Sequence, residues 1–483
     1  MTTLLISLAI LVGGYFIYGL VVEKIIGIDP ARLMPAQTKF DGVDYVEMPT
    51  WKVFLIQFLN IAGLGPIFGA IMGVMFGPAA FLWIVFGTVF AGAVHDFVSA
   101  MMSVRSGGDS LPELVGRELG PVIKQISRIV STVLLILVGA VFIITPAGLL
   151  TGMTPDWATP TFWIAAIFVY YLLATLLPID KLIGRIYPLF GFALLFMAAG
   201  LLYVLLFGGH TIPDGFSEGL FNRHSSPDTH PIFPMMFVSI ACGAISGFHA
   251  TQSPMMVRCL KNEKLARPVF YGAMVAEGIV ALIWAAAAIT FTGGYPELTE
   301  YMTNHSTGDM VHDISVEWLG TFGGLLALLG VVAAPITTGD TALRSARLIV
   351  ADILHFDQKK LLKRIIISVP IFAATFGLMM IDFNVLWRYF AWTNQTLAAF
   401  TLWAATVYLA RNRRAYVICL VPALFMTLVV VSYILVAPSP EGFGLPMWAG
   451  LSVAALADMI CIGMFARYLV LSRQGRIVHE VAY

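Results

Sequence analysis

Charged residues are scarce in this sequence of 483 residues. Asp, Glu, Lys and Arg make up only 12% of it, and 28 basic residues balance 28 acidic ones. Soluble domains carry about 25% charged residues, and nucleic-acid-binding domains need a basic face, so both classes are excluded. The apolar content of 59% and the mean hydropathy of +0.87 instead indicate an integral membrane protein, because a soluble chain cannot bury so much apolar surface.

Cysteine is rare, and the common catalytic motifs are absent. The four cysteines form no CxxC pair and lie in or beside apolar stretches, so we expect small buried side chains without disulfides or zinc. The chain has no Gly-Lys dipeptide for a Walker A loop, no HExxH and no GxSxG. We therefore expect no enzyme, no cofactor and no resident metal. A metal site formed by histidines of two loops stays an alternative, although their spacing matches no known ligand set. These five residues are His210, His224, His230, His305 and His312.

Long apolar runs dominate the chain. In lipid only helices and closed barrels satisfy their backbone groups, and these runs lack the alternation of barrel strands, so the fold class is an all-α polytopic membrane protein. We expect the first run to be a membrane span rather than a cleaved leader, because no basic residues precede it. A span needs about 20 apolar residues, and thirteen runs qualify: 3–22, 52–76, 79–102, 121–150, 160–178, 187–207, 233–257, 268–292, 321–350, 363–382, 388–410, 415–437 and 445–467.

The basic residues predict how the chain is oriented. If the N-terminus lies outside, all but two of the 28 Lys and Arg residues fall on the cytoplasmic side, and only Arg223 and Arg388 fall outside. Cytoplasmic loops of membrane proteins carry such an excess. A missed or false span would scramble the asymmetry, so it favours both the span count and an N-out, C-in topology.

Two spans contain helix breakers near their middle. The second carries Gly63, Gly65 and Pro66, and the seventh carries Gly243 and Gly247. Proline removes a helix hydrogen bond and glycine permits non-helical backbone, although small residues also serve close helix packing. These spans are the first and sixth of a block of ten. Five helices is an odd number, so two five-helix halves must be inverted, as in inverted-repeat transporters.

We therefore divide the chain into a peripheral helix with a cytoplasmic loop (1–51), a first repeat with an outer loop (52–231), a second repeat (232–410) and two accessory helices with a tail (411–483). At the breaks, exposed N–H groups suit an anion and freed carbonyls suit a cation. We expect the substrate to contact Asn60, Gly63, Gly65, Ser246, Gly247, His249 and Gln252.

Ionisable residues inside spans cost about 2.5–3.5 kcal/mol each, so each needs a reason. Glu277, in the middle of span eight, is either a proton acceptor with access to both sides or a protonated acid bonded to a neighbouring helix. Asp96 follows His95 in span three and is either part of the ion path or a structural partner of a cytoplasmic basic residue. At the outer boundary, Asp382 and Arg388 are expected to form a local ion pair.

Span nine carries a polar segment near its cytoplasmic end. Asp340 and Arg344 are spaced i, i+4 and can neutralise each other. The hydroxyls of Thr337, Thr338 and Thr341 either hold a small cation together with freed carbonyls or bond back to their own helix. Asp340 and the threonines are therefore candidates for ion coupling behind Glu277.

The chain resembles the carbon starvation protein A family. The similar segments are Gly42–Val46, Ile61–Pro66, Gly92–Phe97, Gly243–His249, Gly339–Arg347 and Asn394–Gln395. The resemblance implies a secondary transporter of the amino acid–polyamine–organocation type with a LeuT-like core, located in a bacterial inner membrane. It also implies uptake of pyruvate or peptides, with proton symport for the pyruvate carriers.

Residues and resemblance together predict a symporter that couples a proton, or possibly sodium in its place, to a small carboxylate such as pyruvate or to a peptide. The expected partners are this substrate, the ion and the lipid bilayer, with no nucleic acid, and the sequence does not predict the oligomeric state. A nutrient sensor that keeps the transporter fold is the alternative, and an intramembrane enzyme ranks below it.

Overall fold

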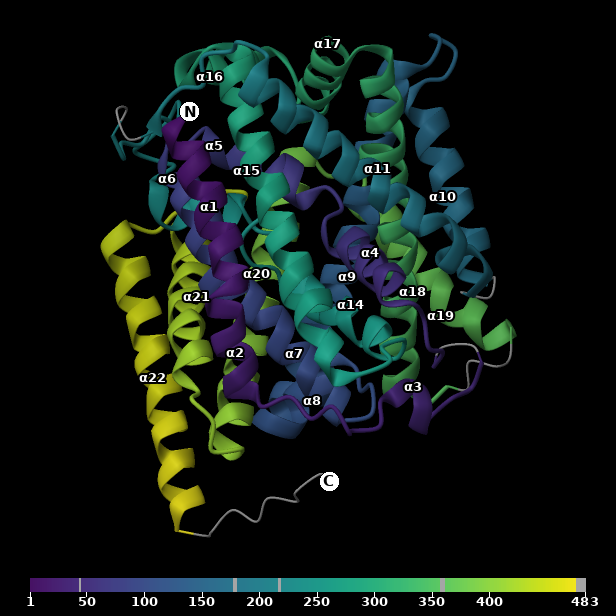
Figure 1. Cartoon of the computed structure of the whole chain (residues 1–483), viewed down its shortest axis with the longest axis vertical. Coiled ribbons are helices and arrows are strands. Elements are labelled where there is room, and N and C mark those ends of the chain that lie inside the picture. The colour runs from purple at the N-terminus through teal and green to yellow at the C-terminus, as the bar shows by residue number, and fades with distance from the viewer. Residues whose placement is uncertain (43–44, 177–179, 216–218, 357–360, 475–483) are drawn as a thin grey trace.

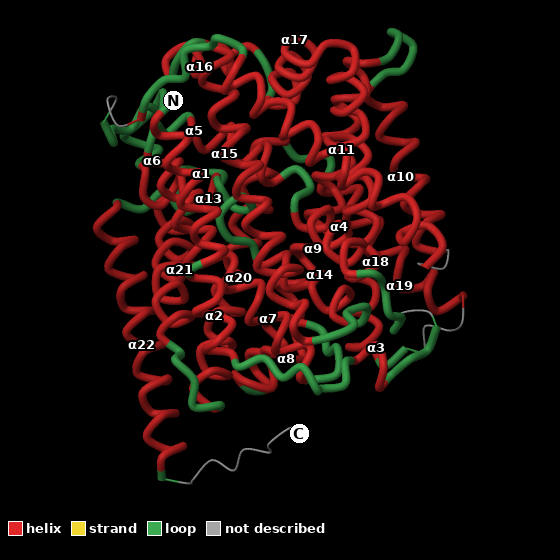
Figure 2. The backbone as a smooth tube through the Cα atoms, viewed as in Figure 1, coloured by secondary structure: helices red, strands yellow, loops and turns green. Residues whose placement is uncertain are grey.

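A computed structural model describes residues 1–483 except 43–44, 177–179, 216–218, 357–360 and 475–483. Residues 43–44, in the first family-like segment, thus lie outside the described part. The described residues form helices and no strand (Figure 2). Their bounds are α1 (Thr2–Phe16), α2 (Tyr18–Ile26), α3 (Pro35–Thr38), α4 (Thr50–Ile61), η1 (Gly65–Gly69), α5 (Ala70–Val74), α6 (Ala79–Leu82), η2 (Trp83–Gly92), α7 (Ala93–Arg105), α8 (Leu111–Leu119), α9 (Pro121–Met153), α10 (Pro160–Leu176), α11 (Asp180–Phe207), η3 (Ile232–Met236), α13 (Phe237–Ser239), α14 (Gly247–Val257), η4 (Glu263–Leu265), η5 (Arg267–Tyr271), α15 (Gly272–Thr292), α16 (Tyr295–Asn304), α17 (Thr307–Ala327), η6 (Leu328–Ala333), α18 (Ala334–Leu354), α19 (Leu361–Leu378), α20 (Phe383–Arg411), α21 (Val417–Val436) and α22 (Met447–Arg473).

Helix α15 occupies the interior of the bundle (Figure 1). It packs against α1, α4, α5, α11 and the π-helical segments η1, η2 and η5, and 83% of its span is buried. Helix α9 packs along α18 and α20, while α22 packs on α21 and leaves most of its surface exposed. A helix that is apolar on all sides belongs in such an interior, so an acidic residue on α15 is removed from both water and lipid.

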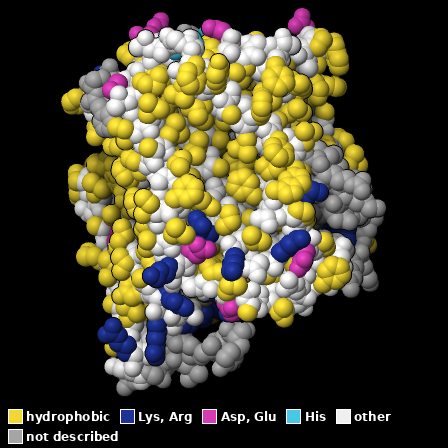
Figure 3. Space-filling view, viewed as in Figure 1, with side chains coloured by type: hydrophobic (Ala, Val, Ile, Leu, Met, Phe, Trp, Pro, Cys, Tyr) yellow, Lys and Arg dark blue, Asp and Glu magenta, His cyan; other side chains and the backbone are white. Residues whose placement is uncertain are grey.

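Apolar side chains cover the flank of the molecule (Figure 3). Large exposed examples are Phe16, Phe196, Trp448 and Met459. Lys and Arg gather toward the end of the molecule where α22 ends, opposite the N-terminus (Figures 1 and 3). An exposed apolar surface of this extent marks contact with lipid, and we call the two ends of the bundle the N-terminal end and the basic end.

Helices lie on each of the thirteen predicted runs. By length and hydropathy, eight helices among the described residues qualify as membrane spans, or nine if the bent pair α4 and η1–α5 is one span. The chain is therefore a multi-pass membrane protein. The count of thirteen spans, the inverted five-helix halves and the division of the chain at 51, 231 and 410 stay predictions.

The predicted break in the second span is present. Helix α4 ends at Ile61, η1 begins at Gly65, and the two parts are bent by 52°. Pro66 has no N–H to continue the α4 hydrogen-bond ladder. The break thus follows directly from the local sequence.

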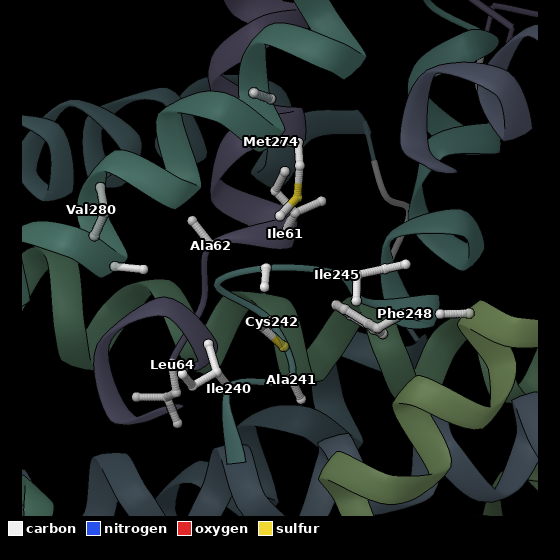
Figure 4. Close-up of a cluster of buried hydrophobic side chains, with 14 of the residues drawn as sticks. Ile61, Ala62, Leu64, Ile240, Ala241, Cys242, Ile245, Phe248, Met274 and Val280 are labelled. Carbon is white, nitrogen blue, oxygen red and sulfur yellow. The ribbon is translucent and has the colours of Figure 1, made fainter. Parts of the chain in front are cut away.

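The seventh span is broken as well, and the two breaks touch. Helix α13 ends at Ser239 and α14 begins at Gly247, with non-helical chain between them. A Cβ atom on Gly65 would lie 2.0 Å from Cβ of Cys242, so only glycine allows this approach. Figure 4 shows the chain around Ala62 and Leu64 beside the segment that carries Cys242.

Substitution of Gly247 tests this packing. Its Cβ atom would lie 2.4 Å from the backbone nitrogen of Ala398 in α20, so Gly247→Ala must push α14 away from α20 and cost about 1–3 kcal/mol. We expect a lower unfolding temperature in detergent. Gly377→Ala is the matched control, because nothing lies within 4 Å of a Cβ atom there. Equal unfolding temperatures for the two variants would contradict the packing.

Candidate functional site

Four ionisable side chains meet in the interior beside the second break. His95 and Asp96 lie on α7, His249 on α14 and Glu277 on α15, and none is exposed. The Nδ1 atoms of His95 and His249 lie 2.7 and 2.8 Å from the two carboxylate oxygens of Asp96. Nε2 of His249 lies 3.4 Å from Oε2 of Glu277. We call this row of four residues the buried cluster.

The hydrogen bonds fix where protons sit in the buried cluster. A carboxylate only accepts, so with Asp96 ionised both imidazoles donate from Nδ1. A neutral His249 then presents a bare Nε2 to Glu277, whose two oxygens have no hydrogen-bond partner among the described residues. One proton between Nε2 and Glu277 can belong to either group. The pair can therefore hold or release a proton while the Asp96 contacts stay intact.

Asp96 is not paired with a cytoplasmic basic residue, which was the structural alternative predicted for it. It is bonded to two imidazoles, His95 beside it and His249 from another helix, instead of to a basic residue of the cytoplasmic side. His95 belongs to the buried cluster, although the sequence analysis did not select it as a candidate site residue. Its adjacency to Asp96 is the signal that was available, because a side chain can bend back to a neighbour even though the two positions point about 100° apart.

The second break is held by amide and hydroxyl groups. Oδ1 of Asn394 on α20 accepts from the hydroxyl of Ser246 at 3.0 Å and from the N–H of Phe248 at 2.7 Å. Thr88 of η2 donates to the carbonyl of Gly243 at 3.1 Å. Ser246 and Gly247, predicted to bind substrate, here join α14 to α20, and Gly65 joins the two breaks.

Other predicted substrate residues keep unused polar atoms. The side-chain oxygens of Asn60 and Gln252 are buried and have no hydrogen-bond partner among the described residues. Gly63 lies at the first break, with Phe142 of α9 against it. Gln57 of α4 donates to Ser253, which donates to the carbonyl of His249 at 2.9 Å. The amides and the buried cluster are thus parts of one polar region between α4 and α14.

The polar segment of span nine lies apart from the buried cluster. Nη2 of Arg344 lies 3.6 Å from Asp340, the predicted i, i+4 pair. Thr337 and Thr341 bond back to carbonyls of α18, which is the second of the two predicted alternatives. Thr338 does the same and also reaches the carbonyl of Leu59 on α4 at 3.4 Å, which makes it the threonine that touches the first break.

The comparisons with known proteins agree with the resemblance seen in the sequence. The family description "Carbon starvation protein CstA" matches residues 1–162 and 156–314. The chain belongs to the carbon starvation protein CstA family. It is 44% identical to an uncharacterised membrane protein of Haemophilus influenzae over 330 residues, which cover 58% of this chain and 89% of that one.

Several curated relatives carry functional names, and two of them show the range. The chain is 28% identical to the Bacillus subtilis peptide transporter CstA, with 88% of each chain covered. It is 28% identical to the Escherichia coli pyruvate/proton symporter BtsT, with 58% of this chain and 48% of that one covered, so it spans about half the length of that relative. Family and relatives make this protein a transporter and not an enzyme.

A solved structure supports the fold. A manganese transporter of Eremococcus coleocola aligns with a TM-score of 0.53 at 14% identity, covering 89% of this chain and 98% of that chain. At this identity the likeness concerns the fold alone.

Ion pairs close the basic end of this CstA-family chain. Oε1 of the buried Glu263 carboxylate lies 3.1 Å from Nε of Arg32 and 3.2 Å from Nε of Arg105, the last residue of α7. Arg105 also donates to the carbonyl of Gly27 and the hydroxyl of Tyr408. These contacts join the chain after α2 to α7, η4 and α20, and such buried pairs are costly to break by removing one partner.

A second contact at the basic end joins α8 to the last residue of α20. Arg411 lies 2.6 Å from Glu118. Burial raises the pKa of the Glu118 carboxyl from 4.5 to about 7, although Arg411 and Arg117 lower it in part. The folded protein therefore holds a proton on Glu118 well above the pH at which a free glutamate loses it, and at neutral pH both forms are populated.

Stability should fall with rising pH through Glu118. Because folding raises this pKa, Glu118 makes its full contribution to the free energy of unfolding below about pH 4.5. This contribution, on the order of 3 kcal/mol, is lost as the pH rises to 7 and beyond. We expect Glu118→Gln to have a higher unfolding temperature than wild type, and we expect this difference to grow from pH 5 to pH 8. Glu113→Gln, on the same helix, is the control: Lys124 and Arg128 outweigh burial and lower that pKa, so its difference from wild type should stay constant there. A constant difference for Glu118→Gln would refute the assignment.

Proposed function

We propose that this transporter is a proton-coupled symporter of a small carboxylate or peptide, with the buried cluster as its proton site. The observation that carries the proposal is the row His95–Asp96–His249–Glu277 beside a broken helix. In this row His249, bonded to Asp96, faces the Glu277 carboxyl, whose oxygens have no hydrogen-bond partner among the described residues. The names of the two curated relatives, a pyruvate/proton symporter and a peptide transporter, support the same substrate classes.

Charge balance gives the cluster its function. Two carboxylates with two neutral imidazoles carry two negative charges, and burying net charge is expensive. Two protons neutralise the cluster, so loss of one proton leaves an unbalanced charge beside α14. Because His249 belongs to the helix that begins at the second break, that charge acts directly on the element at which substrate is expected to bind.

Substrate would bind between the breaks, where Asn60, Gly63, Gly65, Ser246, Gly247, His249 and Gln252 lie. The side-chain oxygens of Asn60 and Gln252 are acceptors without a hydrogen-bond partner among the described residues. They suit the N–H groups of a peptide substrate once the contact between the breaks opens. The orientation in an inner membrane would be N-terminus out and C-terminus in, with the basic end cytoplasmic.

Sodium is the alternative ion. Thr338 contacts the carbonyl of Leu59 at the end of α4, so Thr337, Thr338 and Thr341 could turn from their own helix to a cation at the first break. Asp340 would supply the negative charge behind them. A sensor that keeps the transporter fold is the second candidate, and uptake by the purified protein alone would exclude it.

Uptake into proteoliposomes tests the proton site. We expect an imposed pH gradient to drive accumulation of labelled pyruvate or dialanine without sodium, at about 1.4 kcal/mol per pH unit. Glu277→Gln, which cannot release a proton, should lower this accumulation at least tenfold while exchange of internal for external substrate continues. Exchange needs no net proton movement, so its survival separates lost coupling from lost folding.

Glu317→Gln, an exposed substitution on α17, should transport as wild type and controls for general effects of the change. Normal accumulation by Glu277→Gln would refute the proton assignment. Uptake driven by sodium alone would move the coupling site to the threonines of α18.

A further inference from the structure

A cavity of about 580 Å³ opens at the N-terminal end of the bundle. Its walls come from η1, α5, α9, α16, α17 and α20, so it lies between the outer half of the first broken span and the start of α20. Pockets of this size hold small organic ligands. None of the residues assigned above to the substrate or the ion lines it.

Arg388 supplies the positive charge of this cavity. It is the one Lys or Arg among the described lining residues. Its Nη1 donates to the hydroxyl of Ser239, while its Nε has no hydrogen-bond partner and lies 3.9 Å from Glu441. The expected pair with Asp382 is wrong, because Asp382 caps the start of α20 by accepting from Asn384 and Val385. Arg388 thus keeps unused capacity to donate toward an anion.

The other lining groups favour an organic anion. Met72, Met75 and Met302 give the cavity flexible apolar walls. One oxygen of the Asp309 carboxylate accepts from the backbone N–H and the hydroxyl of Ser306, so this acid is held at the start of α17 while its negative charge stays in the lining. Among the described residues no group of three His, Cys, Asp or Glu side chains is placed to hold a metal.

His224, one of three histidines that line the cavity, is uncharged at neutral pH. Burial and the neighbouring His230 and Arg388 together lower the pKa of His224 to about 4. At neutral pH His224 therefore offers a hydrogen bond without a charge. The permanent positive charge that a ligand meets is that of Arg388.

The floor of the cavity leads to both helix breaks. Ser239, bonded to Arg388, is the last residue before the second break. Phe68 in the floor contacts Trp387, which contacts Phe390, which contacts Phe142, with ring centroids 5.9, 5.3 and 6.2 Å apart. Phe142 ends this row of rings against Gly63 at the first break. A ligand in the cavity is thus separated from the expected substrate site by one row of aromatic rings.

We propose that this cavity is an outer binding site for an organic carboxylate, which Arg388 holds before the aromatic row admits it to the breaks. The proposal rests on the proposed function, since the ligand is the transported substrate. It adds a second site that acts before the proton site and is independent of it. Arg388 is the specificity-determining residue of this second site.

Cysteine labelling in detergent tests the site without transport. Cys461, the half-buried native thiol, is first replaced by serine. Asn384→Cys then places a thiol in the wall, and a polar maleimide should modify it at least fivefold more slowly in the presence of pyruvate or dialanine. Adding Arg388→Gln should abolish this protection, and Arg388→Lys should keep part of it. Glu300→Cys, exposed on α16 outside the cavity, is the control and should show no protection.

Uptake by the same variants separates the two proposals. We expect Arg388→Gln to raise KM at least tenfold and to change kcat less than twofold. If pyruvate and dialanine leave the labelling rate of Asn384→Cys unchanged while uptake is intact, the outer site is overturned and the proposed function stands. Protection without uptake would support the site and overturn symport of these probes, whereas absence of both would overturn both.

Discussion

The carboxylate of Asp96, buried between two imidazoles, is the interaction on which the arrangement of the core depends. A carboxylate in this interior needs donors on both oxygens, and His95 and His249 supply them. Since His249 comes from α14, the bond sets where the second broken helix lies against α7. The same imidazole then faces Glu277 on α15. One buried charge therefore positions three helices and leaves one acid without a partner.

The local sequence was sufficient to predict the breaks but not what they contact. Pro66 and the glycines around it weaken a helix locally, and the structure interrupts α4 there. The bond between Asp96 and His249 joins positions 153 residues apart, and no periodicity within one helix encodes such a distance. The prediction for Arg388 failed for the same reason, because its partner Ser239 arrives from a different helix. Spacing within one helix did predict the pair of Asp340 and Arg344.

The ion pairs at the basic end are contacts that an alternating-access cycle would have to separate. Glu263 is enclosed there by two arginines and the chain after α2, while cavities of about 580 and 640 Å³ open at the N-terminal end and, beside Asp109 and Asp352, at the basic end. Opening the basic end requires separating buried ion pairs, which costs several kcal/mol unless binding elsewhere compensates. In the proposed cycle, substrate and proton binding at the breaks would have to supply this free energy.

The coupling ion decides which gradient can drive the cycle. A pyruvate anion that moves with one proton carries no net charge, so only the pH difference performs work on the pair. A second cation would add about 2.3 kcal/mol per 100 mV of membrane potential. The buried cluster favours the first case, because its two acids and two bases reach neutrality with two protons and exchange one between His249 and Glu277. With the threonines of α18 bonded to their own helix, the structure has one set of residues arranged to exchange a proton and none arranged, among the described residues, around a second cation.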